Sequence, residues 1–381
     1  MARVAVVGVG YSGFNASSPD LSWKEITYEA AVRAYEDAGI NPRRDVDAVV
    51  TCAEDFWEGF AIFDEFVPDQ LGGVLKPTFT VTADFLFGVA NGVMLIKSGL
   101  AEIAVVEAHS KASDILTFGN VVRFAYDPIW LRPVGNGHPF YLAALEKSYY
   151  SNLRGYCDYT FAEVVAKNKK NGRLNPDAPY SADITADDVL SSEPSFYPLR
   201  KLEIAERADG AIVFVLARGD IAKELNPEPV WIDGVGWWSE TSNYDTMSFT
   251  ALYARKSAEM AYEMAGIDNP ARQIDLAEVD DRFAYKEVQH IEALKLAKAG
   301  EVDDLLESGY FDRSGEIPVN VSGGSLSVGN LLEATGAQKA LEVVLQLRGE
   351  AGRRQVDAEV GVAQVWRYLP TATGAVTVFS R

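Results

Sequence analysis

The alternation of hydrophobic and polar positions predicts an α/β chain that contains the same unit twice. The apolar run V-A-V-V-G-V-G at residues 4–10 predicts a buried strand, and A-Y-E-D-A-G-I-N-P from Ala34 predicts the end of an amphipathic helix. Its glycine can end the helix in the left-handed conformation, and its proline does not continue it. V-W-I-D-G-V-G from Val230 and A-Y-E-M-A-G-I-D-N-P from Ala261 repeat this pattern. A period of about half the chain indicates a duplicated unit, because solenoid repeats are only about 20–50 residues long.

The rest of each half continues the alternation of strands and helices, which predicts sheets covered by helices. Strands are expected at 46–51, 78–82 and 103–108 with a helix at 89–98 in the first half, and at 274–280, 318–321, 359–365 and 375–379 with helices at 285–299 and 334–347 in the second. A segment rich in Tyr, Asn, Pro and Asp interrupts the alternation, and a strand at 211–216 resumes it. We therefore predict an N-terminal half (1–112 and 209–225), an inserted cap over that half (113–208) and a C-terminal half (226–381).

Composition narrows the possible partners. The 55 acidic and 35 basic residues give a formal charge of −20, which repels nucleic acid and anionic membranes, so neither is expected as a partner. No apolar run approaches the about 18 residues of a membrane span, and the N-terminus reads as a strand, which together predict a cytoplasmic protein. Cys52 and Cys157 cannot form a disulfide framework or a zinc site of their own, so no metal site is expected.

The stretch with the strongest indication of a functional loop is the glycine- and serine-rich segment from Val321 to Gly336, V-S-G-G-S-L-S-V-G-N-L-L-E-A-T-G. A Walker loop would need Lys-Ser or Lys-Thr after its last glycine, and a Rossmann fingerprint would need G-x-G-x-x-G near a first strand. Neither spacing is present. The stretch is therefore either a catalytic loop or a plain turn from a strand into a helix.

The loop, the two halves and the cap together resemble the thiolase superfamily, most closely its archaeal and sterol-carrier-type branch. In that branch the loop reads N-x-S-G-G, then G-H-P-x-G-A-T-G; Asn320 and residues 322–324 match the first part, and Gly329 and residues 334–336 match the second. The stretch I-K-S-G-L-A-E-I-A-V-V-E from Ile96 matches as well. The resemblance implies a thiolase fold: two βαβαβαββ halves in a layered αβαβα structure. It also implies a coenzyme A thioester as substrate and no covalently bound cofactor.

In this fold the paired glycines let the backbone approach the reacting thioester, and the turn after them aims a side chain into the site. The resemblance therefore implies a set of residues that bind the acyl-CoA: Gly323, Gly324, Ser325, Gly329 and Phe85.

The groups that thiolases use for acyl transfer are missing from the matching positions. The cysteine nucleophile would stand where a strand meets a helix N-terminus, but one count puts Phe85 there and another puts Thr82. The histidine of G-H-P is Asn330, whose amide can donate a hydrogen bond to a thioester oxygen but cannot shuttle a proton. Asp280 replaces the Asn or His of a third motif, and 364–373 contains no base cysteine. These four substitutions argue against a covalent acyl-enzyme.

Some groups that remain can transfer protons. His138 lies in the cap, where some relatives with a small partner subunit place an active-site histidine, although a lone histidine is more often structural. Asp280 and Asp281 end a strand that faces the site, where a partly apolar cleft would raise a carboxylate pKa and make a base; the alternative is a solvated acidic pair. Three phenols near the same loops are either catalytic or packing residues: Tyr285, Tyr368 and Tyr244.

Three functions remain open. Some members of the superfamily lack the cysteine and cleave a β-hydroxyacyl-CoA by a retro-aldol reaction, which needs a base and an oxyanion hole but no nucleophile. The alternatives are a non-catalytic thiolase-like subunit of a heteromeric acyl-CoA complex, and an acetyl-CoA acyltransferase. The resemblance also implies a homodimer, or a heterodimer with another thiolase-like chain, and a small OB-fold protein whose zinc ribbon would hold any zinc.

Overall fold

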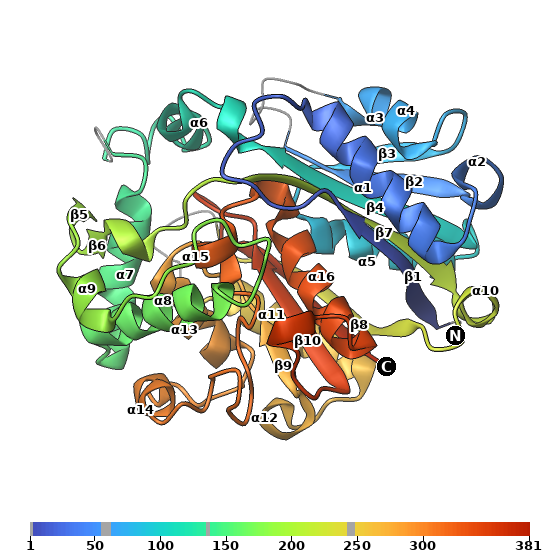
Figure 1. The fold of residues 1–381 in the computed structure, drawn as a ribbon. Coiled ribbons are helices and arrows are strands. Elements are labelled where there is room, and N and C mark those ends of the chain that lie inside the picture. Colours follow the sequence, from blue (N-terminus) through green and yellow to red (C-terminus); the bar gives the residue numbers. More distant parts are fainter. Residues whose placement is uncertain (1–2, 55–61, 135–137, 242–247) are drawn as a thin grey trace.

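A computed structural model describes residues 3–54, 62–134, 138–241 and 248–381 (Figure 1). Its strands in the first half are β1 (Val4–Tyr11), β2 (Ala48–Cys52), β3 (Thr78–Val81), β4 (Ile103–Lys111) and β7 (Asp209–Arg218). Those in the second half are β8 (Val230–Ser239), β9 (Leu276–Glu278), β10 (Val360–Trp366) and β11 (Thr373–Ser380). In the described part of the chain they form one sheet in the order β3-β2-β4-β7-β1-β8-β11-β10-β9.

The two halves repeat the same strand arrangement. The order β2-β4-β7-β1 recurs as β9-β10-β11-β8, and in both series the first pairing is parallel and the next two are antiparallel. The expected strand at 318–321 is reduced to a parallel bridge between Val319 and Ala277, the place that β3 has beside β2. Antiparallel pairing of β1 with β8 joins the halves. The predicted duplication is confirmed.

The helices that follow β1 and β8 explain the repeated glycines. Helix α1 (Trp23–Ala38) ends at Gly39 and α11 (Leu252–Ala265) ends at Gly266, both with positive φ, and a proline opens the short helices α2 (Pro42–Asp45) and α12 (Pro270–Gln273). A Cβ on Gly10 would lie 2.2 Å from a carbonyl oxygen of α1, and one on Gly236 would lie 2.0 Å from a carbonyl oxygen of α11. Glycine at these strand positions therefore lets each helix lie directly on its strand.

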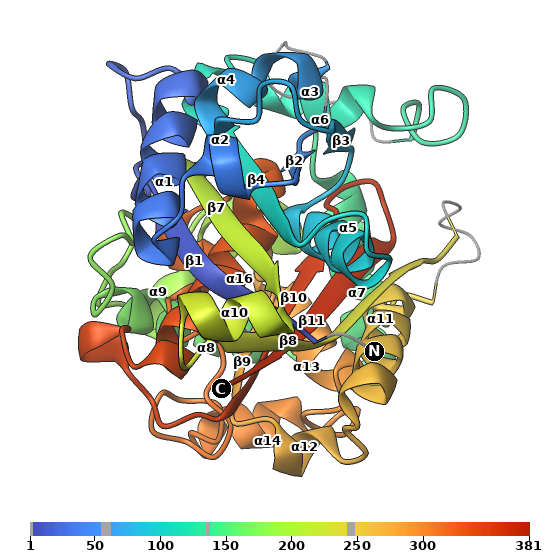
Figure 2. The same cartoon turned by 90° about the vertical axis from the view of Figure 1, so that its right-hand side faces the viewer.

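Helices α5 (Phe85–Lys97) and α16 (Thr335–Arg348) pack together between the two halves of the sheet. Because side chains alternate along a strand, Val106 of β4 faces α5 while Val105 packs in the core under α1. Helices α11 and α13 (Ala284–Ala293) cover the outer face of the second half (Figure 2). This layering is the predicted αβαβα thiolase fold.

The inserted segment between β4 and β7 contains α6 (Phe118–Phe124), α7 (Tyr141–Arg154), α8 (Asp158–Gly172), α9 (Ala186–Leu190) and a hairpin of β5 (Pro194–Phe196) and β6 (Leu199–Arg200). Its main helix, α8, packs on α13, α14 (Val302–Glu307) and α15 (Gly324–Val328), and its Phe161 and Val165 share a hydrophobic core with Val288. The expectation that the cap covers the first half is therefore wrong for α8, because its apolar face is buried against the second half.

The remaining helices are short: α3 (Phe63–Phe66), α4 (Pro68–Leu71) and α10 (Gly219–Leu225). In the described residues, no helix combines the length and the apolar character that crossing a membrane would require.

Candidate functional site

A small cavity lies where the start of α5, the end of β10 and the glycine-rich loop meet. Its volume is about 10 Å³, room for about one water molecule. Two of the residues proposed from the sequence, Asn330 and Tyr368, line this cavity. The other lining residues were not proposed. The full lining is Glu54, Asp84, Arg282, Asn330, Leu332, Glu333, Arg367 and Tyr368. We call this cavity the site cavity.

Asp84 is the N-cap residue of α5 and lies between Thr82 and Phe85, the two positions that the sequence counts gave for the nucleophile. Its Oδ1 accepts a hydrogen bond from the backbone N–H of Gly336 (3.0 Å), while Oδ2 is buried and has no partner in the described residues. Burial raises the pKa of Asp84 well above its usual value, although the nearby Arg282 guanidinium opposes the shift. The surroundings of Asp84 therefore favour the protonated, neutral carboxyl. The two sequence counts bracketed this residue, and an Asp directly before a helix was the signal that would have found it.

Phe85 is the first residue of α5 and belongs to the hydrophobic core. Its ring packs edge to face on Phe214, with 5.0 Å between the centroids, and the residue is fully buried. Phe85 is not part of the site cavity lining, so the structure does not bring it together with Asn330.

Asn330 is held by its backbone and presents its amide to the site cavity. Its N–H donates to Glu206 O (2.7 Å), its carbonyl accepts from Ala208 N (3.0 Å), and its Oδ1 accepts from Leu332 N (3.1 Å). In the described part of the chain its Nδ2 has no hydrogen-bond partner, and the residue is 2% exposed. The amide is therefore a fixed, available donor at the cavity wall.

Asp280 forms a buried ion pair with Arg282, with 2.6 Å between Oδ2 and Nη2. Oδ1 also accepts from the backbone N–H of Arg282 (3.1 Å), and Oδ2 accepts from Trp366 N (3.1 Å). Burial alone would raise the pKa of Asp280, but the Arg282 guanidinium outweighs it and holds the pKa below the usual value. The raised pKa expected for Asp280 is therefore wrong, and its role as a base stays a prediction.

Arg282 turns part of its guanidinium toward the site cavity. Its Nη2 donates to Asp280 and to Trp366 O, whereas Nη1 makes only a 3.4 Å contact with Leu332 O. Burial would lower the pKa of Arg282, but Asp280 more than offsets this, so the side chain stays charged. No local pattern predicts this buried cation, because an arginine in the segment after a strand is usually at the surface.

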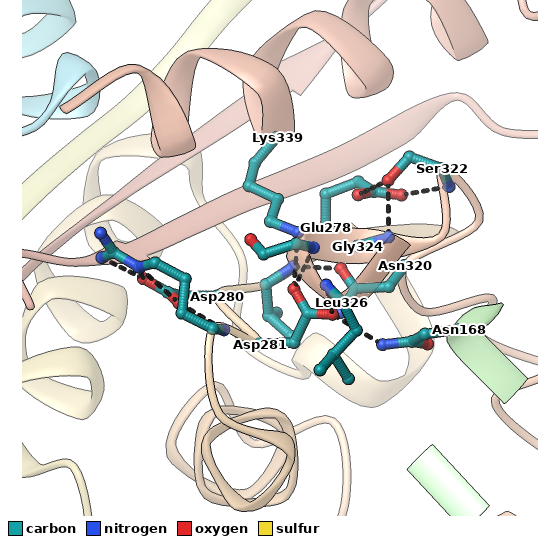
Figure 3. A network of polar contacts seen from close by, with 12 residues as sticks. Asn168, Glu278, Asp280, Asp281, Asn320, Ser322, Gly324, Leu326 and Lys339 are labelled. Carbon is teal, nitrogen blue, oxygen red and sulfur yellow. Dashed lines mark hydrogen bonds and ion pairs between the residues drawn. The ribbon is translucent and has the colours of Figure 1, made fainter. Parts of the chain in front are cut away.

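Asp281 is not part of the site cavity lining and organises the glycine-rich loop (Figure 3). Its Oδ1 accepts from Ser325 N (2.6 Å) and Lys339 Nζ (2.9 Å), and its Oδ2 accepts from Leu326 N (3.2 Å) and Asn168 Nδ2 (2.8 Å). Since Asp280 and Asp281 are both fully buried, the alternative of a solvated acidic pair is also wrong.

The glycines of the loop are required by contacts inside the protein. A Cβ on Gly324 (φ +61°) would lie 2.0 Å from Asp281 Oδ2, and a Cβ on Gly323 (φ +96°) would lie 2.6 Å from the Cα of Gly172 on α8. A Cβ on Gly329 would lie 2.4 Å from the Cβ of Ala208. The missing side chains of Gly323 and Gly324 thus make room for the protein itself.

Contact of these glycines with a thioester stays a prediction, and the same holds for Ser325. That residue is 1% exposed, and its Oγ has no partner in the described residues.

His138 and Tyr285 lie apart from the site cavity lining. The His138 ring packs beside Phe196 in the cap, with 4.9 Å between centroids, and burial lowers its pKa. Tyr285 is buried and donates a hydrogen bond to Glu146 (3.0 Å). Tyr368 lines the site cavity, whereas Tyr244 lies outside the described residues.

No thiol of the described residues borders the site cavity. Cys52 is fully buried under α5, where a Cβ on Gly88 would lie 2.2 Å from its Sγ, and burial raises its pKa well above the usual value. Cys157 is exposed at the start of α8. A search of the same described ranges finds no cluster of three or more His, Cys, Asp or Glu residues suited to a metal ion.

Comparisons with known proteins agree with this architecture. The family model "Thiolase C-terminal domain-like" matches residues 236–380. An acetyl-CoA acetyltransferase from Methanothermobacter thermautotrophicus is 32% identical over 391 residues, covering 100% of both chains. The chain belongs to the thiolase superfamily.

Two further comparisons match a lyase and an aldolase. The 17-hydroxy-3-oxo-4-pregnene-20-carboxyl-CoA lyase of Mycobacterium tuberculosis is 25% identical, over 98% of this chain and 97% of the lyase. The solved structure of the Ltp2-ChsH2(DUF35) aldolase superposes with a TM-score of 0.86 at 23% identity, covering 99% of this chain and 97% of that chain. The family and the fold predicted from the sequence are thus confirmed. The named relatives are an acyltransferase and a lyase, which supports an enzyme of acyl-CoA chemistry.

Proposed function

We propose that this thiolase-superfamily member is a carbon–carbon lyase that cleaves a β-hydroxyacyl-CoA by a retro-aldol reaction. The observation that carries the proposal is the buried carboxyl of Asp84 at the N-cap of α5, whose pKa is raised well above its usual value, in a site cavity that no described thiol borders. A carboxyl kept neutral by burial can donate a proton or a hydrogen bond but is a poor nucleophile. The 25% identity to a lyase supports the same reading.

The reaction needs no covalent enzyme intermediate. A base takes the proton of the β-hydroxyl, the C–O bond becomes a carbonyl, and the Cα–Cβ bond breaks. Its electron pair forms the enolate of the departing thioester, which is the charged species to be stabilised. The enolate Cα then takes a proton from a second group, and a ketone or aldehyde and a shortened acyl-CoA leave. The proton held by the base must return to that second group before the next turnover.

Two donors face the site cavity from different elements. Asn330 offers Nδ2, and Arg282 offers Nη1 with a full positive charge. Donors fixed before the substrate arrives stabilise a developing oxyanion without reorganising. We therefore propose that Asn330 and Arg282 hold the enolate oxygen.

The proton transfers require a second pair of groups. We propose that neutral Asp84 delivers a proton to the enolate carbon, and that Glu333, the cavity carboxylate on the Asn330 loop, accepts the hydroxyl proton. Asp280 was one of the bases considered from the sequence, and its oxygens are engaged by Arg282 and Trp366. His138 and Tyr285 would need to move to reach the substrate.

A thioester is larger than the site cavity, so some side chains must be displaced on binding. Arg367 and Glu54 form an ion pair (2.5 Å) and are the cavity residues that are not fully buried. We propose that the acyl-CoA reaches the cavity past this pair.

The small cavity also favours a second candidate, a non-catalytic subunit. A volume of about 10 Å³ and an ion pair on the wall are what a site closed to substrate would show. The acetyltransferase reading rests on the 32% identical relative, and the lack of a bordering thiol in the described residues argues against it.

For partners, we propose acyl-CoA and a heteromer with a small DUF35-type chain, since the aldolase structure is that of a complex with a DUF35 protein. A dimer of thiolase-like chains remains part of the proposal. Any zinc would reside in the small chain's OB-fold and zinc ribbon.

The proposal is tested by incubating the protein, alone and with its genomic-neighbour chains, with β-hydroxyacyl-CoA and β-ketoacyl-CoA substrates. Mass spectrometry then follows the CoA esters. Release of a ketone or aldehyde that survives iodoacetamide treatment supports the lyase. Thiol-dependent cleavage of β-ketoacyl-CoA would establish the acyltransferase instead. Activity that appears only with a second thiolase-like chain bearing Cys and His would establish the subunit reading. A Cys157→Ala variant is the control for alkylation of the exposed thiol.

A further inference from the structure

Three buried charges lie beneath the glycine-rich loop and take no part in the chemistry proposed above. They are Glu278 at the end of β9, Asp281 three residues later, and Lys339 on α16; each is fully buried. We call these three residues the loop clamp. Figure 3 shows Lys339 reaching from its helix toward Asp281.

Glu278 fixes the start of the loop. Its Oε1 accepts from Ser322 N (3.0 Å) and its Oε2 accepts from Ser322 Oγ (2.7 Å). The same hydroxyl accepts a hydrogen bond from Gly324 N (3.1 Å). The Ser322 hydroxyl therefore links the backbone of Gly324 to the carboxylate of Glu278. The bonds fix both the backbone and the side chain of Ser322.

Asp281 fixes the next turn, and Lys339 connects the two carboxylates. Asp281 binds Ser325 N and Leu326 N, and Lys339 Nζ lies 2.9 Å from Asp281 Oδ1 while also attracting Glu278. Two buried carboxylates thus share one buried ammonium, so removing that ammonium would leave two uncompensated charges.

The clamp is close to Asn330 along the chain. Ser325, held by Asp281, accepts the N–H of Gly329 (2.8 Å), and Asn330 is the next residue. Because α15 is a single short turn, a shift at Ser325 is passed directly to Asn330.

The charge of the clamp changes near neutrality. Burial raises the pKa of Glu278 to about 7, Lys339 opposes this shift, and Glu342 on α16 adds to it. Glu342 is itself paired with Arg354 (2.8 Å). From β10 the neighbour of Glu278 in register is Ala363, which carries no charge.

We infer that Lys339 and Glu278 are positioning residues, which hold the glycine-rich loop so that Asn330 faces the site cavity, and that ionisation of Glu278 loosens this hold. The kinetic consequence rests on the proposed function, whereas the loop's stability does not. The sign follows from linkage: a carboxyl that binds its proton more tightly in the closed loop favours the closed loop as pH falls.

Hydrogen exchange measured by mass spectrometry tests the inference without any substrate. For peptides covering residues 321–330, the opening equilibrium, corrected for the chemical exchange rate, should be about tenfold larger at pH 8 than at pH 6. Glu278→Gln should abolish this step, since it removes the ionisable group and keeps the shape. Glu224→Gln, an exposed position on α10, should retain it. Lys339→Met should open the loop at both pH values.

The results of these experiments test the loop clamp independently of the proposed reaction. A loop equally protected at pH 6 and pH 8, or a pH step that persists in Glu278→Gln, overturns the inference even where lyase activity is present. If the pH step is present but no lyase activity is found, the inference about the loop clamp is supported and the proposed function is contradicted. If Lys339→Met does not fold, Glu278→Gln still decides. In an active preparation, the two variants should lower kcat more than they change KM and should shift the pH profile of kcat, which a general loss of stability would not do.

Discussion

Arg282 and Asp280 form a fully buried ion pair on the wall of the site cavity, with 2.6 Å between Nη2 and Oδ2. Replacing Arg282 by Met should lower the free energy of unfolding by about 3–5 kcal/mol, because Asp280 would remain as an unpaired buried charge. Chemical denaturation with guanidinium measures this loss.

The matched control is the double variant Asp280→Asn/Arg282→Gln, which removes both charges and keeps the approximate shape. It should recover much of the lost stability, since neutral side chains are not penalised in the same way. A single variant as stable as the wild type would mean that the pair is hydrated, and would contradict the buried assignment.

The second prediction concerns the pH dependence that Asp84 contributes. Its pKa in the folded protein is raised by burial above the unfolded value of 3.8, so its contribution to stability is fully present below that value and is lost as pH rises toward the folded pKa. Asp84→Asn removes the ionisable group, and the variant should therefore gain stability relative to wild type between pH 4.5 and pH 8.

Urea denaturation of both proteins at pH 4.5, 6 and 8 gives the difference directly. A difference that is constant across these values would show that Asp84 keeps an ordinary pKa. Turnover of Asp84→Asn should fall in the lyase assay even where stability rises, because the amide cannot deliver a proton.

Much of the fold was predictable because its signals are local. Gly39 and Gly266, each followed by a proline, mark the same helix end twice, and the strands before these helices share the G-V-G pattern. The helix ends depend on local backbone conformation, which short sequence patterns report. The position of α8 was not predictable in this way, because its partners α13 and α15 lie more than 100 residues away in the sequence.

The residues of the candidate site also divide into those with a local sequence signal and those without one. Asn330 was found from a motif, since its neighbours set the turn that presents it. Arg282 and Asp84 were not found in this way. Arg282 becomes a buried cation only through its contacts with Trp366 and Asp280, and the pKa of Asp84 is raised only because the fold buries its carboxyl. Burial of ionisable groups depends on these long-range contacts, and the spacing of hydrophobic residues along the chain does not predict them.

The third prediction uses two glycines that share a conformation. Gly324 has φ +61° and its Cβ would lie 2.0 Å from Asp281 Oδ2, whereas Gly349 has φ +74° and nothing within 4 Å. Gly349→Ala should cost about 1–2 kcal/mol for the left-handed backbone alone. Gly324→Ala should cost more than the control by about 2 kcal/mol or more, because Asp281 must also move away from Ser325 N and Lys339.

Thermal and chemical unfolding of the two variants measure the costs. Equal costs would mean that the Asp281 carboxylate moves without penalty, and that the loop is not held as described.

The last prediction isolates the donor role of Asn330. Its Oδ1 caps Leu332 N (3.1 Å) while its Nδ2 is available at the site cavity, so one side chain performs two functions that a pair of variants can separate. Asn330→Asp keeps an oxygen for Leu332 N and removes the amide donor, while Asn330→Ala removes both. If Nδ2 stabilises the enolate oxygen, both variants should lower kcat by about 10²-fold with a smaller change in KM. Wild-type turnover in Asn330→Asp together with loss in Asn330→Ala would instead assign the residue to holding the turn, and the oxyanion would then depend on Arg282 alone.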